Sequence, residues 1–132
     1  MLTDAHKDDI ELALMRVKQA AKDDIVAGNK AAFLLYLQEE VGEVAECIEV
    51  EMGMKSRKIK EPLEDECVDV VVAALGNYFN AGGTVDNLCE VLKKKTKKWL
   101  DRTQKKKTKK QITLGPFRHY GGGVEITTQA IE

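Results

Sequence analysis

The sequence predicts an all-α protein folded as a bundle of four helices, and three observations lead to this prediction. Aliphatic residues recur every three or four positions, which is the period of amphipathic helices. Glycine and proline gather at a few points and divide the chain into stretches of helical length. The chain has 132 residues, of which 43% are hydrophobic, as expected for one globular domain.

The first two helices are predicted from their apolar stripes. The first extends from about residue 5 to residue 27 and ends at Gly28 and Asn29, which suit a helix C-cap and turn. Its stripe consists of Ile10, Leu14, Val17, Ala21 and Ile25. The second helix extends from about residue 30 to residue 51. Its stripe consists of Leu34, Leu37, Val41, Val44 and Ile48.

A loop with Gly53 and a basic cluster is predicted over residues 52–60, before the third and fourth helices. Pro62 suits the first turn of the third helix, which continues to about Asn80. That helix is apolar over most of its circumference, which is typical of a buried helix. Two glycines end it, and Thr84 is a suitable N-cap for the fourth helix. One side of the fourth helix carries Val85, Leu88, Leu92 and Trp99.

Two regions are expected, a helical domain over residues 1–102 and a basic C-terminal region over residues 103–132. From Thr103 to Lys110 the chain is nearly all lysine and offers no apolar side chain to bury. The segments Gln111–Leu114 and Val124–Thr128 have a β-like composition. We therefore expect a short hairpin or an extended arm at the C-terminus.

The net charge of −1 conceals a strong asymmetry along the chain. Residues 1–92 carry 9 basic and 19 acidic side chains, whereas residues 93–118 carry 12 basic and 1 acidic. The acidic part is suited to hold a metal ion, and the basic part is suited to hold phosphate.

Several features favour a cytoplasmic protein without a membrane partner. Cys47, Cys67 and Cys89 form no C-x-x-C motif, so neither a zinc ribbon nor a disulfide framework is indicated, and we expect them to be small core residues. No stretch approaches the roughly 18 apolar residues of a membrane-spanning helix. Acidic residues follow soon after Met1, which is not typical of a signal peptide.

Two acidic pairs, Glu40-x-x-Glu43 and Glu66-x-x-Asp69, occur on the second and third predicted helices. A spacing of three places the members of each pair on one face of a helix, about 60° apart around its axis. Helices joined by a short loop usually pack antiparallel, which brings the two pairs opposite one another. Four carboxylates so assembled repel one another unless a cation binds among them. The pattern therefore predicts a Mg²⁺ or Mn²⁺ site.

A solvated helix face is the competing interpretation, because charged residues make up 33% of the chain. It explains an isolated E-x-x-E pair well, although Glu40 borders the apolar stripe of its helix. It explains the second pair poorly, since Glu66 and Asp69 share a narrow arc of an otherwise apolar helix and an unpaired buried charge is costly. A metal or ligand site is favoured for that reason.

The acidic motifs and their layout resemble the MazG-like branch of the all-α nucleotide pyrophosphohydrolases. The matching segments are Glu39-Glu40-Val41-Gly42-Glu43-Val44-Ala45-Glu46 and Glu64-Asp65-Glu66-Cys67-Val68-Asp69-Val70, followed by the Gly82-Gly83-Thr84-Val85 turn into a helix with Lys95 and Arg102. The resemblance covers roughly residues 5–102. It implies cleavage of nucleoside triphosphates to the monophosphate and pyrophosphate, in control of the nucleotide pool. A purine deoxynucleotide is the substrate we expect.

The resemblance also implies roles for individual residues. Two or more Mg²⁺ or Mn²⁺ ions would be bound by Glu40, Glu43, Glu66 and Asp69. Lys95 and Arg102 match the basic positions that meet the phosphates, whereas Trp99 stands where the family commonly has asparagine. Lysines of the 55–60 loop or of the 95–102 helix, Lys98 among them, would neutralise the leaving pyrophosphate.

The expected reaction is attack of water on the α-phosphorus. Glu39 or Glu43 would orient or deprotonate this water, and the sequence does not decide between them. Asn77 and Asn80 lie on the site-facing arc of their helix and would contact base or sugar, although Asn80 fits equally well as a helix C-terminal residue. Four short helices bury little apolar surface alone, so we expect a homodimer or homotetramer.

Three other functions agree less well with the sequence. A nucleic-acid-binding protein would use Lys93–Lys110, but only Trp99 interrupts these lysines with an aromatic ring, so we do not expect nucleic acid as a partner. A di-iron bundle requires Glu-x-x-His motifs, and both His6 and His119 lie outside the acidic helices. A purely structural helical adaptor would not explain the charges on the third helix.

Overall fold

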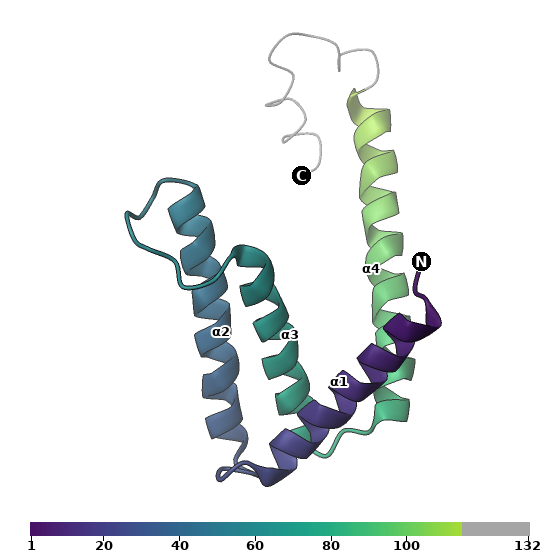
Figure 1. The fold of residues 1–132 in the computed structure, drawn as a ribbon. Helices are drawn as coiled ribbons and strands as arrows, with labels where there is room; N and C mark the ends of the chain where they lie inside the picture. The colour runs from purple at the N-terminus through teal and green to yellow at the C-terminus, as the bar shows by residue number, and fades with distance from the viewer. Residues whose placement is uncertain (115–132) are drawn as a thin grey trace. The chain divides into compact units, whose positions relative to one another are not determined.

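The computed structural model describes residues 1–114 and confirms the all-α prediction, with no strand in that range. Four helices follow one another along this part of the chain (Figure 1). They are α1 (Asp4–Asp23), α2 (Lys30–Glu51), α3 (Leu63–Asn80) and α4 (Val85–Leu114). None of these helices combines the length and apolarity needed to cross a membrane.

The chain divides into two compact units. The three-helix unit, Met1–Val85, contains α1, α2 and α3, and the second unit begins at Asp86 and contains the rest of α4. The helix α4 continues without a break through the lysine-rich segment. Gln111–Leu114 also belong to α4, so the β-like structure predicted for these four residues is wrong. The remainder of the predicted arm, including Val124–Thr128, lies outside the described residues.

Capping groups explain where α1 begins and ends. The hydroxyl of Thr3 accepts from the backbone N–H of His6 at 3.1 Å, and Nδ1 of His6 accepts from the backbone N–H of Thr3 at 3.2 Å. The helix ends at Asp23, earlier than predicted, because Asp24 adopts an extended conformation and its side chain accepts from the N–H of Val26. Ile25, predicted to complete the apolar stripe, therefore lies in a turn and is fully exposed.

The bounds of α2 and α3 agree closely with the sequence prediction. Asn29 caps α2 by accepting from the N–H of Ala32, and Gly28 before it has a φ of 84°, which favours glycine. Pro62 directly precedes α3. Gly83, after α3, has no room for a side chain, since an added Cβ would lie 2.2 Å from the ring of Tyr78.

The helix α3 packs against both α1 and α2 and is the centre of the three-helix unit. The loop between α2 and α3 reverses the chain, so these two helices run antiparallel (Figure 1). The buried residues of the unit are few. They are Ala21, Phe33, Cys47, Glu66 and Phe79.

The inward face of α2 is rotated by one residue from the predicted stripe. Phe33 and Cys47 are buried, whereas their neighbours Leu34 and Ile48 are exposed. The predicted stripe therefore contains two adjacent rows of residues, and one of them, Leu34, Val41 and Ile48, remains uncovered in a single chain.

The helix α3 is likewise not buried over most of its circumference in a single chain, contrary to prediction. Val68 and Val71 are 59% and 56% exposed, because α1 and α2 cover only part of the helix. The prediction that all three cysteines are core residues is also wrong, since Cys67 and Cys89 are exposed and only Cys47 is buried. The three-helix unit thus presents an extensive apolar surface around a small core.

Candidate metal centre

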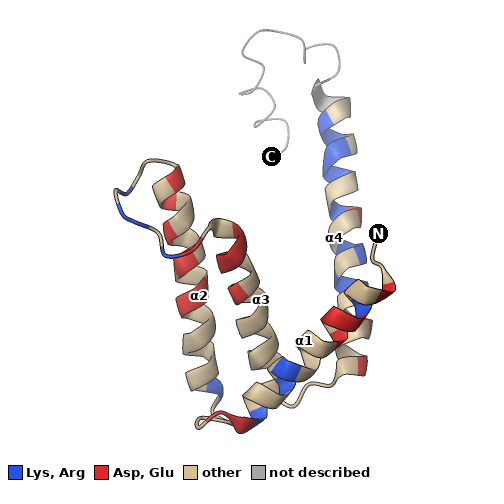
Figure 2. Cartoon of the chain, viewed as in Figure 1, with Lys and Arg blue, Asp and Glu red and all other residues tan. Residues whose placement is uncertain are grey.

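Acidic residues gather where α2 ends and α3 begins. The antiparallel arrangement places the C-terminal half of α2 beside the first turns of α3, and both segments are marked by acidic residues in Figure 2. The three-residue spacings keep Glu40 with Glu43, and Glu66 with Asp69, on the facing sides of these helices. The loop between the helices closes the same end of the pair.

Two groups of three carboxylates form there, and they share Glu66. In the first group, oxygens of Glu40, Glu43 and Glu66 lie within 4.8 Å of one another. In the second group, oxygens of Glu61, Glu66 and Asp69 meet the same limit. All four predicted metal ligands therefore belong to one cluster, joined by a fifth carboxylate, Glu61.

Glu61 was not among the residues singled out from the sequence. It directly precedes Pro62, and a residue before proline is held extended, so Glu61 lies beside the first turn of α3 and not on it. One signal in the sequence could have identified Glu61. It is an acidic residue directly before the proline at the start of the helix that carries Glu66. Its side chain is exposed, unlike that of Glu66.

Glu66 is the most unusual member of the cluster, because it is a carboxylate with only 2% of its surface exposed. Its Oε2 atom is buried and has no hydrogen-bond partner among the described residues. Burial, followed by hydrogen bonding to and repulsion by Glu43, raises the pKa of Glu66 to about 7. Burial and the charge of Glu43 also raise the pKa of Glu40. Burial and mutual repulsion thus favour the protonated form of these two carboxyl groups in the metal-free protein.

The donor set fits a hard divalent cation. Mg²⁺ binds oxygen ligands at about 2.0–2.1 Å, so two ligands on opposite sides of the ion lie roughly 4.2 Å apart. Carboxylate oxygens within 4.8 Å of one another need only a small adjustment to reach that spacing. Within the described residues both groups consist of carboxylates alone, which favours Mg²⁺ or Mn²⁺ over metals that prefer nitrogen or sulfur.

A cavity of about 340 Å³ adjoins the cluster. Acidic residues of α2 and α3 form part of its lining, and basic residues of the loop form another part. The lining residues are Glu43, Glu46, Cys47, Arg57, Lys58, Ile59, Lys60 and Glu66. Carboxylates and cations therefore border one space of a size suited to a small anion.

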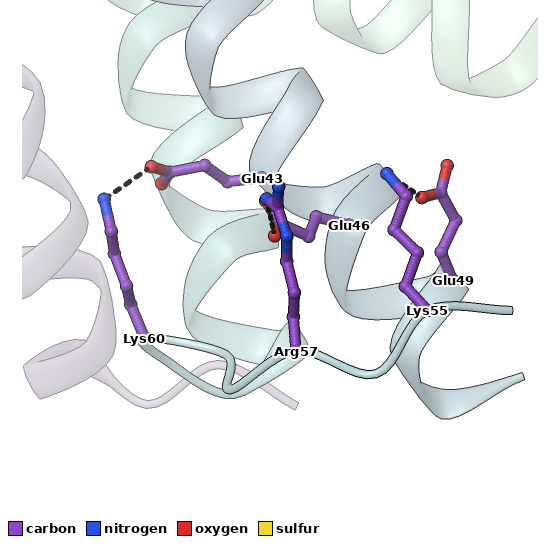
Figure 3. A network of polar contacts seen from close by, with 6 residues as sticks. All are labelled: Glu43, Glu46, Glu49, Lys55, Arg57 and Lys60. Carbon is purple, nitrogen blue, oxygen red and sulfur yellow. Dashed lines mark hydrogen bonds and ion pairs between the residues drawn. The ribbon is translucent and has the colours of Figure 1, made fainter. Parts of the chain in front are cut away.

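Three ion pairs attach the loop to α2, as Figure 3 shows. The three glutamates are three residues apart on α2, and the three cations of the loop pair with them in the reverse order along the chain. The pairs are Glu43 with Lys60 at 3.4 Å, Glu46 with Arg57 at 2.7 Å, and Glu49 with Lys55 at 2.5 Å. The hydrogen bond from Arg57 lowers the pKa of Glu46. Sequence reasoning predicted a basic loop here but not its attachment to α2.

The remaining predicted residues of the three-helix unit are not members of the carboxylate cluster. Glu39 is exposed and belongs to neither carboxylate group. The amide nitrogen of Asn77 donates to the backbone carbonyls of Phe33 and Ala73. The side-chain oxygen of Asn80 accepts from the N–H of Gly28 at 2.6 Å. At 1.5 Å per residue both asparagines lie roughly 16–21 Å along α3 from Glu66, so the structure does not bring them to the carboxylates.

The predicted phosphate-binding residues Lys95, Lys98 and Arg102 belong to the second unit and are exposed on α4. Lys98 and Arg102 line a shallow basic groove on that helix, and Trp99 between them is exposed. The groove also contains Lys94, Lys97, Asp101 and Lys105.

Comparisons of the chain with known protein families, with curated proteins and with solved structures find no match. Its function is therefore inferred from its own residues.

Proposed function

We propose that this protein is a metal-dependent nucleotide pyrophosphohydrolase that cleaves a (d)NTP to the (d)NMP and pyrophosphate. One observation carries the proposal: the buried Glu66, with an unpartnered oxygen, belongs to both three-carboxylate groups. A buried carboxylate without a positive partner is strongly unfavourable. Bound Mg²⁺ or Mn²⁺ would satisfy it, and two carboxylate groups sharing one residue suit two or more ions.

The cavity beside the cluster supports a polyphosphate substrate. Phosphate oxygens are commonly bound between hard cations and basic side chains. Here two of the carboxylates that would hold the ions, Glu43 and Glu66, border the same cavity as three basic side chains of the loop. The resemblance of the two acidic motifs to the MazG-like pyrophosphohydrolases supports cleavage between the α- and β-phosphates.

In the proposed reaction, Glu40, Glu43, Glu66 and Asp69 hold the ions, with Glu61 as a further candidate ligand. The bound metal would lower the pKa of a coordinated water and polarise the phosphate oxygens. Of the two candidate bases, Glu43 belongs to the cluster and Glu39 does not. We therefore assign to the carboxylate oxygen of Glu43 that does not bind the ion the orientation and deprotonation of the water that attacks the α-phosphorus.

The exposed apolar rows on α2 and α3 support a homodimer or homotetramer as the active form. Apolar side chains such as Leu34, Val41, Val68 and Val71 would gain by contact with another copy. A purine deoxynucleotide as substrate, control of the nucleotide pool and a cytoplasmic location complete the proposal.

The test is release of pyrophosphate from each of the eight common (d)NTPs in the presence of Mg²⁺ or Mn²⁺. We expect pyrophosphate, and not orthophosphate, from at least one of them. Glu66→Gln and Asp69→Asn should abolish this release while circular dichroism shows the same helix content. Glu64→Gln is the matched control, because Glu64 is exposed on the same helix and belongs to neither carboxylate group. Full activity of both cluster variants would overturn the assignment.

Nucleic-acid binding is a second candidate function, favoured by the unbroken helix through the lysine-rich segment. A helix spaces side chains four residues apart by about 6 Å, so its lysines form ordered rows and not a random cluster. If this is the function, salt-dependent retention on DNA should persist in Glu66→Gln and be lost when Lys94, Lys98 and Arg102 are replaced together by glutamine. Retention that is unaffected by this triple replacement would reject it.

A further inference from the structure

We propose that the basic loop (residues 52–62) provides cations that bind the substrate's polyphosphate. We further propose that Lys60 exchanges Glu43 for a phosphate oxygen when the divalent ion binds. This inference rests on the proposed function, and it names the phosphate-binding residues of the same site.

The cavity beside the cluster places the loop's cations next to the carboxylates. Arg57, Lys58 and Lys60 line it together with Glu43 and Glu66, which belong to the cluster. A phosphate group in this cavity would meet basic side chains and also the ions held by the carboxylates. The pyrophosphate part of the substrate carries the most negative charge, so its binding would be strengthened most by the basic side chains and the metal ions.

Lys60 competes with a metal ion for Glu43. Its ammonium lies 3.4 Å from Oε1 of Glu43. Glu43 is a member of the first carboxylate group and so a candidate metal ligand. A divalent ion bound to Glu43 would neutralise that carboxylate and repel Lys60. Binding of the ion therefore releases this lysine next to the cavity it already lines.

The three ion pairs of the loop differ in length and exposure, and this difference allows Lys60 to leave Glu43 while the loop stays attached. The Lys60 pair is the longest of the three, and the Lys60 side chain is 82% exposed, so the pair is weak and easily broken. Arg57 pairs at 2.7 Å with Glu46, which belongs to neither carboxylate group. Arg57 would thus keep the loop attached to α2 while Lys60 changes partner.

Lys58 and Lys55 distinguish phosphate binding from loop attachment. Lys58 lines the cavity and forms no ion pair within residues 1–114. Lys55 forms the same kind of ion pair as Lys60, but it pairs with Glu49 and does not line the cavity. Lys55→Gln is therefore a matched control for Lys60→Gln on the same loop.

The experiment titrates the full-length protein calorimetrically, first with Mn²⁺ and then, when loaded, with inorganic pyrophosphate. Lys60→Gln should bind Mn²⁺ about threefold more tightly, because a competing cation is gone. It should bind pyrophosphate about tenfold more weakly, because a charge-assisted hydrogen bond is lost. Lys58→Gln should weaken only pyrophosphate binding, and Lys55→Gln should change neither.

The outcomes separate this inference from the proposed function. Unchanged pyrophosphate binding by both Lys60→Gln and Lys58→Gln, with loss of binding in Lys98→Gln or Arg102→Gln, would place the phosphates on α4 and overturn the inference alone. Weaker Mn²⁺ binding by Lys60→Gln would overturn the exchange. Failure of the unmodified protein to bind Mn²⁺ would overturn the proposed function itself.

Discussion

The two ends of the α2–α3 pair differ in whether their polar side chains have hydrogen-bond partners. At the end where α3 finishes, the amide of Asn77 is bound to backbone carbonyls, and Asn80 accepts from the N–H of Gly28. At the end where α3 begins, Glu66 is buried with an oxygen that has no partner among the described residues. The first end uses polar groups to join segments, and the second leaves a buried carboxyl oxygen without a partner in the described part of the chain.

The contrast shows how the structure distinguishes a supporting region from a candidate site. The Nδ2 atom of Asn80 is also buried and has no partner within residues 1–114, but that group is neutral and the side-chain oxygen of Asn80 is paired. An unpaired ionised group is far more unfavourable than an unpaired amide. The buried carboxyl group of Glu66 can avoid this cost by holding a proton or by meeting a cation, and the second possibility is the basis of the proposed metal site.

The largest effect on stability should come from the supporting end. Phe33→Ala removes a buried ring that contacts Gly76 and Tyr36, and we expect a loss of about 3–5 kcal/mol in the free energy of unfolding. Urea unfolding followed by circular dichroism measures it. Leu35→Ala is the control, because Leu35 is an exposed residue of the same helix. Equal losses in the two variants would contradict the assignment of the core.

At the other end, stability should depend on pH through Glu66. Its pKa is raised from 4.5 to about 7 in the folded protein, so the folded state retains a proton that the unfolded state has released. The stability of the metal-free protein should therefore fall as the pH rises from about 4.5 through 7. Glu66→Gln should flatten this dependence when urea unfolding is repeated at pH 5 and pH 8. An identical slope in the variant would show that other groups cause it.

Metal binding should reverse that loss. Mn²⁺ at about 100 times its dissociation constant should raise the free energy of unfolding by roughly 2.7 kcal/mol, because the ion binds only the folded site. Thermal unfolding at pH 8 with Mn²⁺ and with EDTA measures the difference. Glu66→Gln should lose most of the gain, and Glu64→Gln should keep it. A gain of the same size in both variants would indicate binding elsewhere.

A smaller effect is expected from Asn77→Ala, which removes the bonds to the carbonyls of Phe33 and Ala73. Loss of these contacts should lower the free energy of unfolding by about 1–2 kcal/mol. Calorimetric titration should show Mn²⁺ binding unchanged, since Asn77 lies far from the carboxylates. Weakened metal binding would show that the two ends of the helix pair are coupled.

The sequence predicted the parts of the fold that depend on local chemistry. The turn at Asn29 and the breaker Pro62 located the starts of α2 and α3, and the spacing of Glu66 and Asp69 predicted a common face. These features act over a few residues, so a single sequence contains them fully.

Features that depend on contacts between distant residues were not predicted. The apolar stripe of α2 holds two adjacent rows, and the row that packs on α3 also includes Glu40, so hydrophobicity alone gave the wrong inward face. The pairing of Arg57 with Glu46 depends on how the loop folds back. The bond from Asn77 to Phe33 links residues 44 positions apart. Each required the relative placement of two segments.

The exposed Cys67 offers a built-in reporter of self-association. Its thiol lies in a shallow apolar groove that α2 and α3 form together, with Val41, Val44 and Val70 as the other lining residues. Alkylation of this thiol should be rapid in a dilute sample and slow as the protein is concentrated, whereas the buried Cys47 should react slowly throughout. The reaction rate of this one sulfur atom would thus follow the assembly by mass action, without any substitution in the chain.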